Sequence, residues 1–527
     1  MTLLALAGLT GATLVSVAAP IGPANADNAH TFLFPGNLLV SRSVYQGDAG
    51  LLTPGTTMLP PGCIGSNCVA ATNDGSYPGV WNNDHVDGSF GITAPIFLDQ
   101  ITPNGHYLDT VPVPTRDLVT SFPSKSEIGL NLSTNGRYIT FMGYSAPVNG
   151  LDVSNSNTPG AIDPTNPVPG SYFRTVAQMD SFGHFTFTET NAYSGNNGRA
   201  AILNDSNGAD VYYTSGNGGN GGNPQPASII TGTGAQLVTP SRLPERLQRP
   251  GATTPVGSFN VTQLGDKPDK IGKDDNFRGL TVFDNVVYFT KGSGGNGVNT
   301  VYFIDTTGKA CPSGVGVPQP GATLPTTPLS YNPATVQQTG LPNNMCVLAG
   351  FPTALKSTTS FPFGVWFANP DTAYVTDEGN GDTTYSAATN TYTTAAGQTM
   401  AGLQKWVRSN GVWHLAYTLA NGLNLGAPYP VRGYPTGDNA ATGLPWAPAT
   451  DGLRNITGPV NRDGTVTLWA ITSTVSGAGD TGADPNKLVA ITDRVSATTA
   501  GAQGFTTVRS ANADEVLRGV SFTPRWF

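Results

Sequence analysis

The stretch DDNFRGLTVFDNVVYFTKGSGGNGVNTVYFID, residues 274–305, contains an arginine, two short apolar runs and a glycine-rich loop. The apolar runs predict two β-strands, because they are short and rich in β-branched and aromatic residues. The same order of leading residue, strand, polar turn and second strand returns elsewhere in the chain. The leading positions of the six copies are Glu127, Arg199, Arg278, Phe363, Arg454 and Arg518.

A two-strand motif that returns at long, irregular intervals is typical of β-propeller blades with outer loops of different lengths. Further strand-like runs follow several copies, for example GLQKWVRSNGVWHLAYTL, which alternates around the turn at Asn410. The sequence therefore predicts an all-β fold, a six-bladed β-propeller. Seven blades are an alternative, because the segment between Tyr45 and Ile92 is long enough to hide strands. Two stacked β-sandwiches are another.

The two ends of the chain complement each other. The last copy, VLRGVSFTP, stops after one strand, whereas the N-terminal strands NLLVSRSVY and APIFLDQITP lack a leading one. We expect one blade to be built from both ends, with the strand after Arg518 innermost. Such closure by both chain termini leaves no open sheet edge in the ring.

The composition suits an exported globular protein. Glycine (66) and proline (42) are abundant, but 38% of residues are hydrophobic and 9% aromatic, which is unlike a disordered chain. The net charge is -8 and no lysine- or arginine-rich run occurs, so nucleic-acid binding is not expected. No segment beyond the N-terminus is apolar enough to predict a membrane span, and we expect a monomer.

Residues 1–26 predict a secretory signal peptide, because the apolar run Leu3–Ala19 precedes a small-x-small site that ends at Ala26. A membrane anchor is the alternative reading of this run. Residues 27–527 then form a single propeller domain of a secreted protein.

The four cysteines fit a secreted protein, because disulfides form in the oxidising environment outside the cell. Cys63–Cys68 and Cys311–Cys346 are the simplest of the three possible pairings, because each closes a local loop. A zinc site is the alternative, although no histidine lies near either pair and the spacings match no common zinc pattern.

Several of these segments carry a resemblance. On SGNNGRAAIL, KDDNFRGLT, TKGSGGNGVNTVY, DGLRNITG and GADPNKLVAITD, most of the chain resembles secreted β-propeller proteins of bacteria and fungi. By architecture alone it is similar to the six-bladed group that includes gluconolactonase-like hydrolases and β-propeller phytases. The resemblance implies the fold and export, and it assigns no catalytic residue.

The leading residues are the main candidates for a ligand site. Equivalent positions in a closed ring converge on one mouth of the central channel, so Glu127, Arg199, Arg278, Arg454 and Arg518 are expected to lie together. Guanidinium groups there would form an anion site, since each offers a planar fork to carboxylate or phosphate. Alternatively, each arginine pairs with a nearby acid and only staples the blades. Lys291, before a glycine-rich loop, belongs to a second candidate layer.

Other residue types suggest further chemistry. Asp274, Asp275, Asp377 and Glu378 are candidate calcium ligands, since Ca²⁺ takes six to eight oxygens, although no EF-hand spacing occurs. His85 lies in the polar, aromatic segment YPGVWNNDHVDGSFG and is a candidate general base, with Arg278 as its catalytic partner. A surface or structural histidine is the alternative.

The sequence thus predicts a propeller that binds an extracellular glycan or small organic anion at its channel mouth. As an enzyme it would be a polysaccharide lyase or an ester hydrolase. The alternative is a non-enzymatic binding or scaffold module at the cell surface.

Overall fold

In a computed structural model, the described residues are 32–47, 49–60, 68–78, 91–218, 234–241, 256–259, 276–292, 298–330, 344–355, 359–478 and 481–526. The predicted signal peptide, residues 1–26, lies outside them. In the described part, no helix has the length and apolarity needed to span a membrane.

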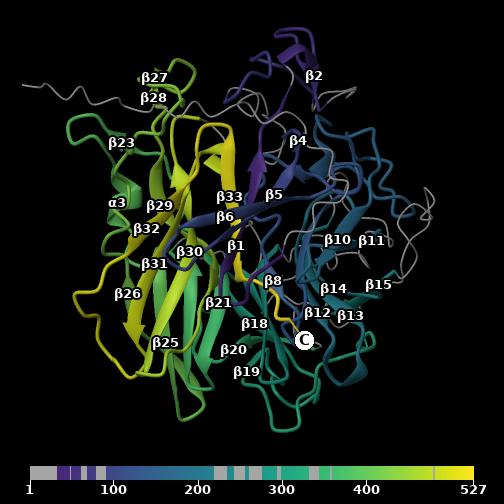
Figure 1. Cartoon of the computed structure of the whole chain (residues 1–527), viewed down its shortest axis with the longest axis vertical. Coiled ribbons are helices and arrows are strands. Elements are labelled where there is room, and N and C mark those ends of the chain that lie inside the picture. Colours follow the sequence, from purple (N-terminus) through teal and green to yellow (C-terminus); the bar gives the residue numbers. More distant parts are fainter. Residues whose placement is uncertain are drawn as a thin grey trace, which may run out of the picture.

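Six antiparallel sheets form the blades (Figure 1). Each blade is named here from its innermost strand outward. Blade 1 consists of β33 (Glu515–Phe522), β1 (Leu38–Val44), β5 (Ile96–Ile101) and β6 (Tyr107–Pro112); blade 2 of β8 (Asn131–Leu132), β9 (Ile139–Tyr144), β10 (Arg174–Met179) and β11 (Phe185–Thr190); and blade 3 of β12 (Gly198–Asn204), β13 (Val211–Gly216), β14 (Ala235–Val238) and β15 (Val256–Phe259).

The second half of the chain forms the other three blades. Blade 4 consists of β16 (Phe277–Phe283), β17 (Val286–Lys291), β18 (Thr300–Ile304) and β20 (Met345–Leu348), with the short parallel strand β19 (Val315–Gly316) at its edge; blade 5 of β21 (Pro362–Asn369), β22 (Thr372–Asp377), β25 (Gly402–Ser409) and β26 (Val412–Leu419); and blade 6 of β29 (Ala449–Thr457), β30 (Thr465–Val475), β31 (Lys487–Arg494) and β32 (Thr506–Ser510).

Short elements lie in the loops between and within the blades. They are the strand pairs β2–β3 (Met58–Leu59, Val69–Ala70), β4–β7 (Thr93–Ala94, Thr120–Ser121), β23–β24 (Tyr385–Ser386, Thr391–Tyr392) and β27–β28 (Asp438–Asn439, Leu444–Pro445), the helix α3 (Thr393–Gly397), and the 3₁₀ turns η1 (Ala49–Leu51), η3 (Val153–Asn155), η4 (Ser206–Gly208) and η6 (Thr481–Ala483).

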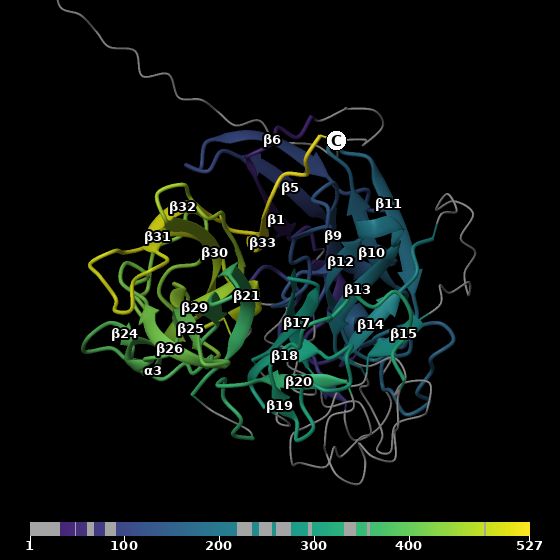
Figure 2. The same cartoon turned by 90° about the horizontal axis from the view of Figure 1, so that it is seen from below.

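The ring closes as the sequence predicts. Strand β33, from the C-terminal end, pairs antiparallel with β1, from Leu38 opposite Phe522 to Val44 opposite Glu515. In Figure 2 the blades succeed one another from purple through teal and green to yellow, and yellow β33 lies beside purple β1. The six-bladed prediction is therefore confirmed, and the sandwich alternative is wrong.

An apolar cluster fills each of the six interfaces between blades. Between blades 4 and 5, for example, Phe283 stacks on Phe367 with ring centroids 4.8 Å apart, and Phe351 stacks on Trp406 at 4.0 Å. Burial of these faces is the main driving force for assembling the ring.

Hydroxyl groups on the second strands tie most blades to the next. Ser41 Oγ donates to the carbonyl of Ile128 at 2.6 Å, and Thr140 Oγ1 donates to that of Ala201 at 2.6 Å. In the same way, Thr290 Oγ1 donates to the backbone carbonyl of Phe363, and Thr376 Oγ1 donates to the backbone carbonyl of Arg454. These bonds fix the height of each innermost strand against its neighbour, which sets the positions of the leading residues.

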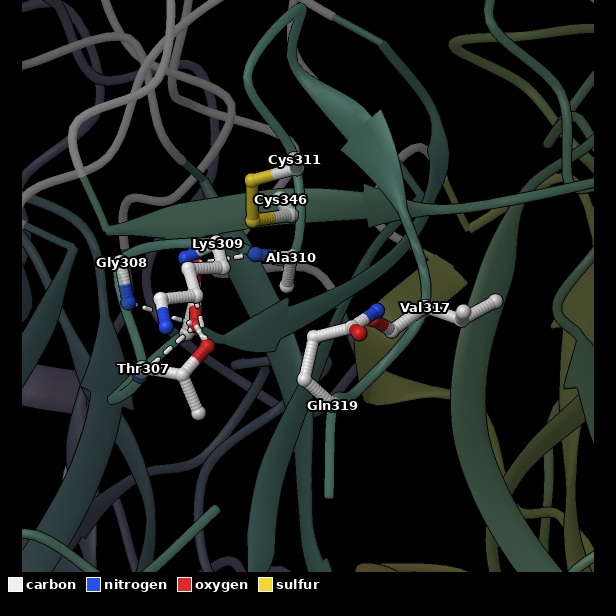
Figure 3. Close-up of a disulfide and its surroundings, with 9 residues drawn as sticks. Thr307, Gly308, Lys309, Ala310, Cys311, Val317, Gln319 and Cys346 are labelled. Carbon is white, nitrogen blue, oxygen red and sulfur yellow. Dashed lines mark hydrogen bonds between the residues drawn. A yellow bond between two sulfur atoms is a disulfide. The ribbon is translucent and has the colours of Figure 1, made fainter. Parts of the chain in front are cut away.

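One disulfide, Cys311–Cys346, joins the segment after β18 to β20, as predicted (Figure 3). Its Cα atoms lie 5.9 Å apart. Asp305 orders the turn before Cys311, because its carboxylate accepts the N–H groups of Thr307 at 2.8 Å and Ala310 at 2.8 Å. Cys68 is also disulfide-bonded, whereas Cys63 lies outside the described residues.

Candidate functional site

β-Bulges aim the leading residues into the channel. The innermost strand of five blades loses its register with the second strand at the leading residue, which is left without a partner opposite. A bulge bends the strand and redirects the side chain at that point. Arg199, Arg278, Arg454 and Arg518 therefore leave the plane of their sheets at the bulges of the innermost strands. The end of the channel on the N-terminal side of these bulges is here called the upper mouth.

Blade 2 places Glu127 at the upper mouth by a different route. The next residue, Ile128, has φ 50°, a left-handed conformation that is rare for a β-branched residue. The Glu127 carboxylate is buried and accepts hydrogen bonds from Thr120 Oγ1 at 2.7 Å, Ser121 N at 2.9 Å and Asn197 Nδ2 at 2.8 Å, and from the Tyr144 hydroxyl. The strained turn is thus held in place by a fully bonded carboxylate.

A small pocket of about 160 Å³ opens at the upper mouth between blades 2, 3 and 4. Its lining is polar and cationic: Lys125, Arg199 and Arg278 provide positive charge, Asn196, Asn197, Asn217 and Asn276 provide amides, and Ser124 and Ser126 provide hydroxyls. Pro123 completes the lining, and among the described residues no carboxylate takes part. Such a set of donors suits an anion.

Arg199 is 4% exposed and is only partly satisfied by the protein. Its Nη1 donates to the Phe277 carbonyl at 2.8 Å and to Asn276 Oδ1, but within the described part of the chain its buried Nε has no hydrogen-bond partner. Burial, reinforced by the charge of Arg278, holds the pKa of Arg199 well below its usual range. An anion in the pocket would offset the cost of burying this charge beside Arg278.

Glu378 is the counter-charge of the arginines. Its Oε2 lies 3.1 Å from Arg454 Nε, and its Oε1 lies 3.9 Å from Arg278 Nε. Burial opposes ionisation of Glu378, but the charges of Arg278, Arg454 and Lys125 outweigh it and lower its pKa. The alternative from the sequence was that acids local to each arginine would be the partners. Of these, Asp451 interacts electrostatically with Arg454, and Asp274 and Asp275 lie outside the described residues.

Two arginines near the upper mouth are engaged within the protein. Arg518 Nη2 donates to the carbonyls of Gly482, at 2.8 Å, and Phe122. Arg174, which sequence reasoning missed, is fully buried and donates to the carbonyls of Tyr172, Ser154, Ser156 and Asn196. These two side chains brace loops and do not line the pocket.

The remaining candidates are placed as follows. Lys291 is buried at the end of β17, donates to Asn299 Oδ1 at 3.3 Å and is not part of the pocket lining. Asp377 accepts the N–H groups of Phe361 and Gly379. Among the described residues, neither Asp377 nor Glu378 belongs to a group of three possible metal ligands. His85, Asp274 and Asp275 lie outside the described residues, so the calcium and general-base hypotheses stay predictions.

Two buried carboxyls near the upper mouth predict a pH-dependent stability. Burial raises the pKa of Asp377 to about 7 and that of Asp451 to about 6. The folded state therefore holds protons that the unfolded chain releases near pH 4, so this stabilisation is complete below about pH 4 and is lost as pH rises through about 6 to 7. We expect Tm to fall over that window.

Asp451→Asn should flatten this part of the curve, because the amide carries no titratable proton, whereas Asp438→Asn, on an exposed loop, should leave the curve unchanged. Thermal unfolding between about pH 4 and pH 8 measures the effect. A wild-type Tm that rises steadily across this range would contradict the assignment.

Lys125 and Asn197 escaped the sequence analysis. Both lie in loops, two residues before a leading position, and neither belongs to a recurring pattern. Arg174 gave no signal either, because it begins an ordinary outer strand. For Lys125 and Asn197, closeness to a leading residue along the chain was the only signal that the sequence offered.

Comparisons with known proteins give distant likenesses. No protein family and no curated protein matches the sequence. The chain is similar in structure to a protein of unknown function from Dyadobacter fermentans, with 8% identity, a TM-score of 0.30 and coverage of 76% of this chain and 96% of that one. It is also similar to an ulvan lyase of polysaccharide lyase family PL25 bound to -[GlcA(1-4)Rha3S]- (10% identity, TM-score 0.30, 95% and 98% covered).

A Synechocystis apocarotenoid oxygenase is similar at the same level, with 8% identity, a TM-score of 0.30 and 94% of each chain covered. At these TM-scores the likenesses carry no information about activity.

Proposed function

We propose that this protein is secreted and binds a small organic anion or an acidic glycan at the upper mouth of its channel. The supporting observation is the pocket that Lys125, Arg199 and Arg278 line, with no carboxylate among its described lining residues. Arg199 contributes a buried Nε–H that has no acceptor among the described residues. A carboxylate accepts such donors in a fork geometry, and the low local dielectric strengthens the interaction.

The charges around the pocket also support an anion. Lys125, Arg278 and Arg454 interact electrostatically with Glu378, and Arg199 interacts with both Glu127 and Glu378. Glu127 is saturated by hydrogen bonds, and Glu378 is shared by two arginines. The positive charges of Lys125, Arg199 and Arg278 line the pocket, where a ligand carboxylate would balance them.

Lys125→Gln is the sharpest test of binding, because Lys125 is only partly buried and its replacement should leave the fold intact. We expect the affinity for citrate and for glucuronate, measured by isothermal titration calorimetry, to fall about tenfold, which corresponds to the loss of one charge-assisted hydrogen bond. Wild-type affinity should also weaken with added salt, and less so in the variant.

Lys309→Gln is the matched control, since Lys309 is exposed on blade 4 away from the upper mouth. It should bind both anions as the wild type does. If neither anion binds the wild-type protein, or if the two lysine variants behave alike, the proposed function is wrong.

Catalysis at the same site is a second and more specific proposal. In a lyase acting on an acidic polysaccharide, Arg278 beside the substrate carboxylate would stabilise the enolate that forms when a proton is removed. The base suggested by the sequence is His85 or a tyrosine. Incubation with polygalacturonate, followed by ultraviolet absorbance of the unsaturated product, tests this step, and an ester substrate tests the hydrolase version.

A non-enzymatic binding or scaffold role is favoured by a separate observation. Arg454, Arg518 and Arg174 donate to acceptors inside the protein, so much of the arginine set at the upper mouth braces the ring. Citrate binding without turnover of any acidic polysaccharide or ester would be the result expected of such a module.

A further inference from the structure

The other end of the channel holds a second and larger cavity, here called the lower chamber. Its volume is about 580 Å³, and residues from all six innermost strands line it. These are the later residues of those strands, beyond the bulges that hold the arginines. In Figure 2 the molecule is seen from below, with the inner strands β33, β12 and β21 toward the middle of the ring. The lower chamber shares no lining residue with the upper pocket.

The lower chamber has a different chemistry from the upper mouth. Among its described lining residues there is neither lysine nor arginine, and Asp284, an exposed residue of the β16–β17 turn, is the charged one. The rest are apolar, hydroxyl and amide side chains together with the aromatic residues Phe283 and Trp366. The edges of the innermost strands also face the channel, so their backbone groups add donors and acceptors.

Several polar groups of the lining are open to a ligand. Within the described part of the chain, the indole N–H of Trp366, the hydroxyls of Thr281 and Thr457, the Nδ2 of Asn455 and the Oδ1 of Asn131 make no hydrogen bond, and all five residues are partly exposed. The other amide atoms of the two asparagines are engaged: Asn455 Oδ1 accepts Val520 N at 2.7 Å, and Asn131 Nδ2 donates to the Ala201 carbonyl at 3.2 Å. These bonds hold the open amide atoms in place.

We propose that the lower chamber is a second ligand site, which takes a neutral sugar. Alternating donors and acceptors match sugar hydroxyls, because a hydroxyl both donates and accepts. The partly exposed aromatic rings suit the apolar face of a pyranose. The volume lies in the range of small-molecule sites and accommodates a mono- or disaccharide. No lysine or arginine occurs among the lining residues that the structure describes, which disfavours an anion, so the two ends of the channel select ligands of different charge.

The test uses glucose, galactose and cellobiose with the full-length protein, followed by calorimetry and by ¹⁵N–¹H spectra of the tryptophan indoles. We expect at least one of these sugars to bind and to shift the Trp366 indole signal, which is identified by its absence in Trp366→Phe. Thr281→Val keeps the size of the side chain and removes one hydroxyl, so it should weaken sugar binding about fivefold, the loss of one neutral hydrogen bond.

Two controls separate this proposal from the upper site. Thr506→Val removes a hydroxyl from the outer strand β32 and should leave sugar affinity unchanged. Lys125→Gln should also bind the sugar normally, whereas Thr281→Val should bind citrate normally. If none of the three sugars binds, or if Thr281→Val and Trp366→Phe bind as tightly as the wild type, the lower chamber is not a sugar site, whatever the result with citrate.

Discussion

Glu378→Gln should destabilise the protein by about 3–5 kcal/mol, the cost of removing one partner from a buried ion pair. Glu378 is 7% exposed, and its carboxylate lies 3.1 Å from Arg454 Nε. The glutamine amide keeps the shape of the side chain but leaves Arg454 buried without its counter-charge. The same loss should make citrate bind more tightly, because Glu378 no longer competes for Arg278.

The two opposite effects make this variant informative. Urea unfolding measures the stability and calorimetry measures the citrate affinity, both near neutral pH. Asp371→Asn is the matched control, since Asp371 pairs with Arg408 at 2.9 Å but its side chain is 65% exposed, so its loss should cost at most about 1 kcal/mol. Arg454→Met in the Glu378→Gln background should recover part of the stability, because it removes the stranded charge.

A loss of stability without tighter citrate binding would mean that Glu378 does not influence the upper pocket. Unchanged stability would mean that solvent reaches the ion pair, and the description of Glu378 and Arg454 as a buried ion pair would then be wrong.

The repeat in the sequence predicted most of the fold. Position in the repeat translated into position in space because a closed ring makes equivalent residues neighbours. This holds for Arg199 and Arg278, which line one pocket, and for Arg278 and Arg454, which share Glu378. The orphan strand around Arg518 predicted the closure for the same reason, since it had no partner within its own repeat.

Which arginines pair with a carboxylate and which line the pocket could not be predicted from the sequence. Arg199 and Arg454 occupy the same place in the repeat, yet Arg199 has an unpaired Nε among the described residues whereas Arg454 has a carboxylate. The difference arises from Glu378, which follows β22 in a neighbouring blade and reaches Arg454 across the interface. Local sequence patterns do not encode which blade supplies a counter-charge, so Glu378 could not be assigned to Arg454 from the sequence.

The lower chamber illustrates a second limit. Its open polar atoms lie on strand residues such as Thr281, Thr457 and Trp366, which read as ordinary alternating strand positions. They become accessible because they lie on the innermost strands, at the end where the channel is wide enough to hold the cavity. A property of the whole ring creates this site, and no short segment carries its signature.

Ring closure depends on close approach of blades 1 and 2 at Gly519. A Cβ atom there would lie 2.5 Å from Leu130 N and 2.6 Å from the Ile128 carbonyl, both backbone atoms that cannot move independently of their strands. Gly519 N also donates a hydrogen bond to Ser41 Oγ at 2.8 Å, the hydroxyl that donates to the Ile128 carbonyl of blade 2. Gly519→Ala should therefore push β33 away from β8 and weaken the contact that closes the ring.

We expect Gly519→Ala to cost about 3 kcal/mol, near the upper end of the cost of overpacking, because the clash is with backbone. Gly397→Ala is the matched control: it has open space around its Cβ position and lies at the end of α3, so its stability should change by less than about 1 kcal/mol. Urea unfolding gives the two values. Hydrogen exchange should locate the damage in Leu38–Val44 and Glu515–Phe522, since these strands lose their support first when the closing blade separates from blade 2. Equal stabilities of the two variants, or faster exchange confined to blades 4 and 5, would show that the ring is not held at this junction.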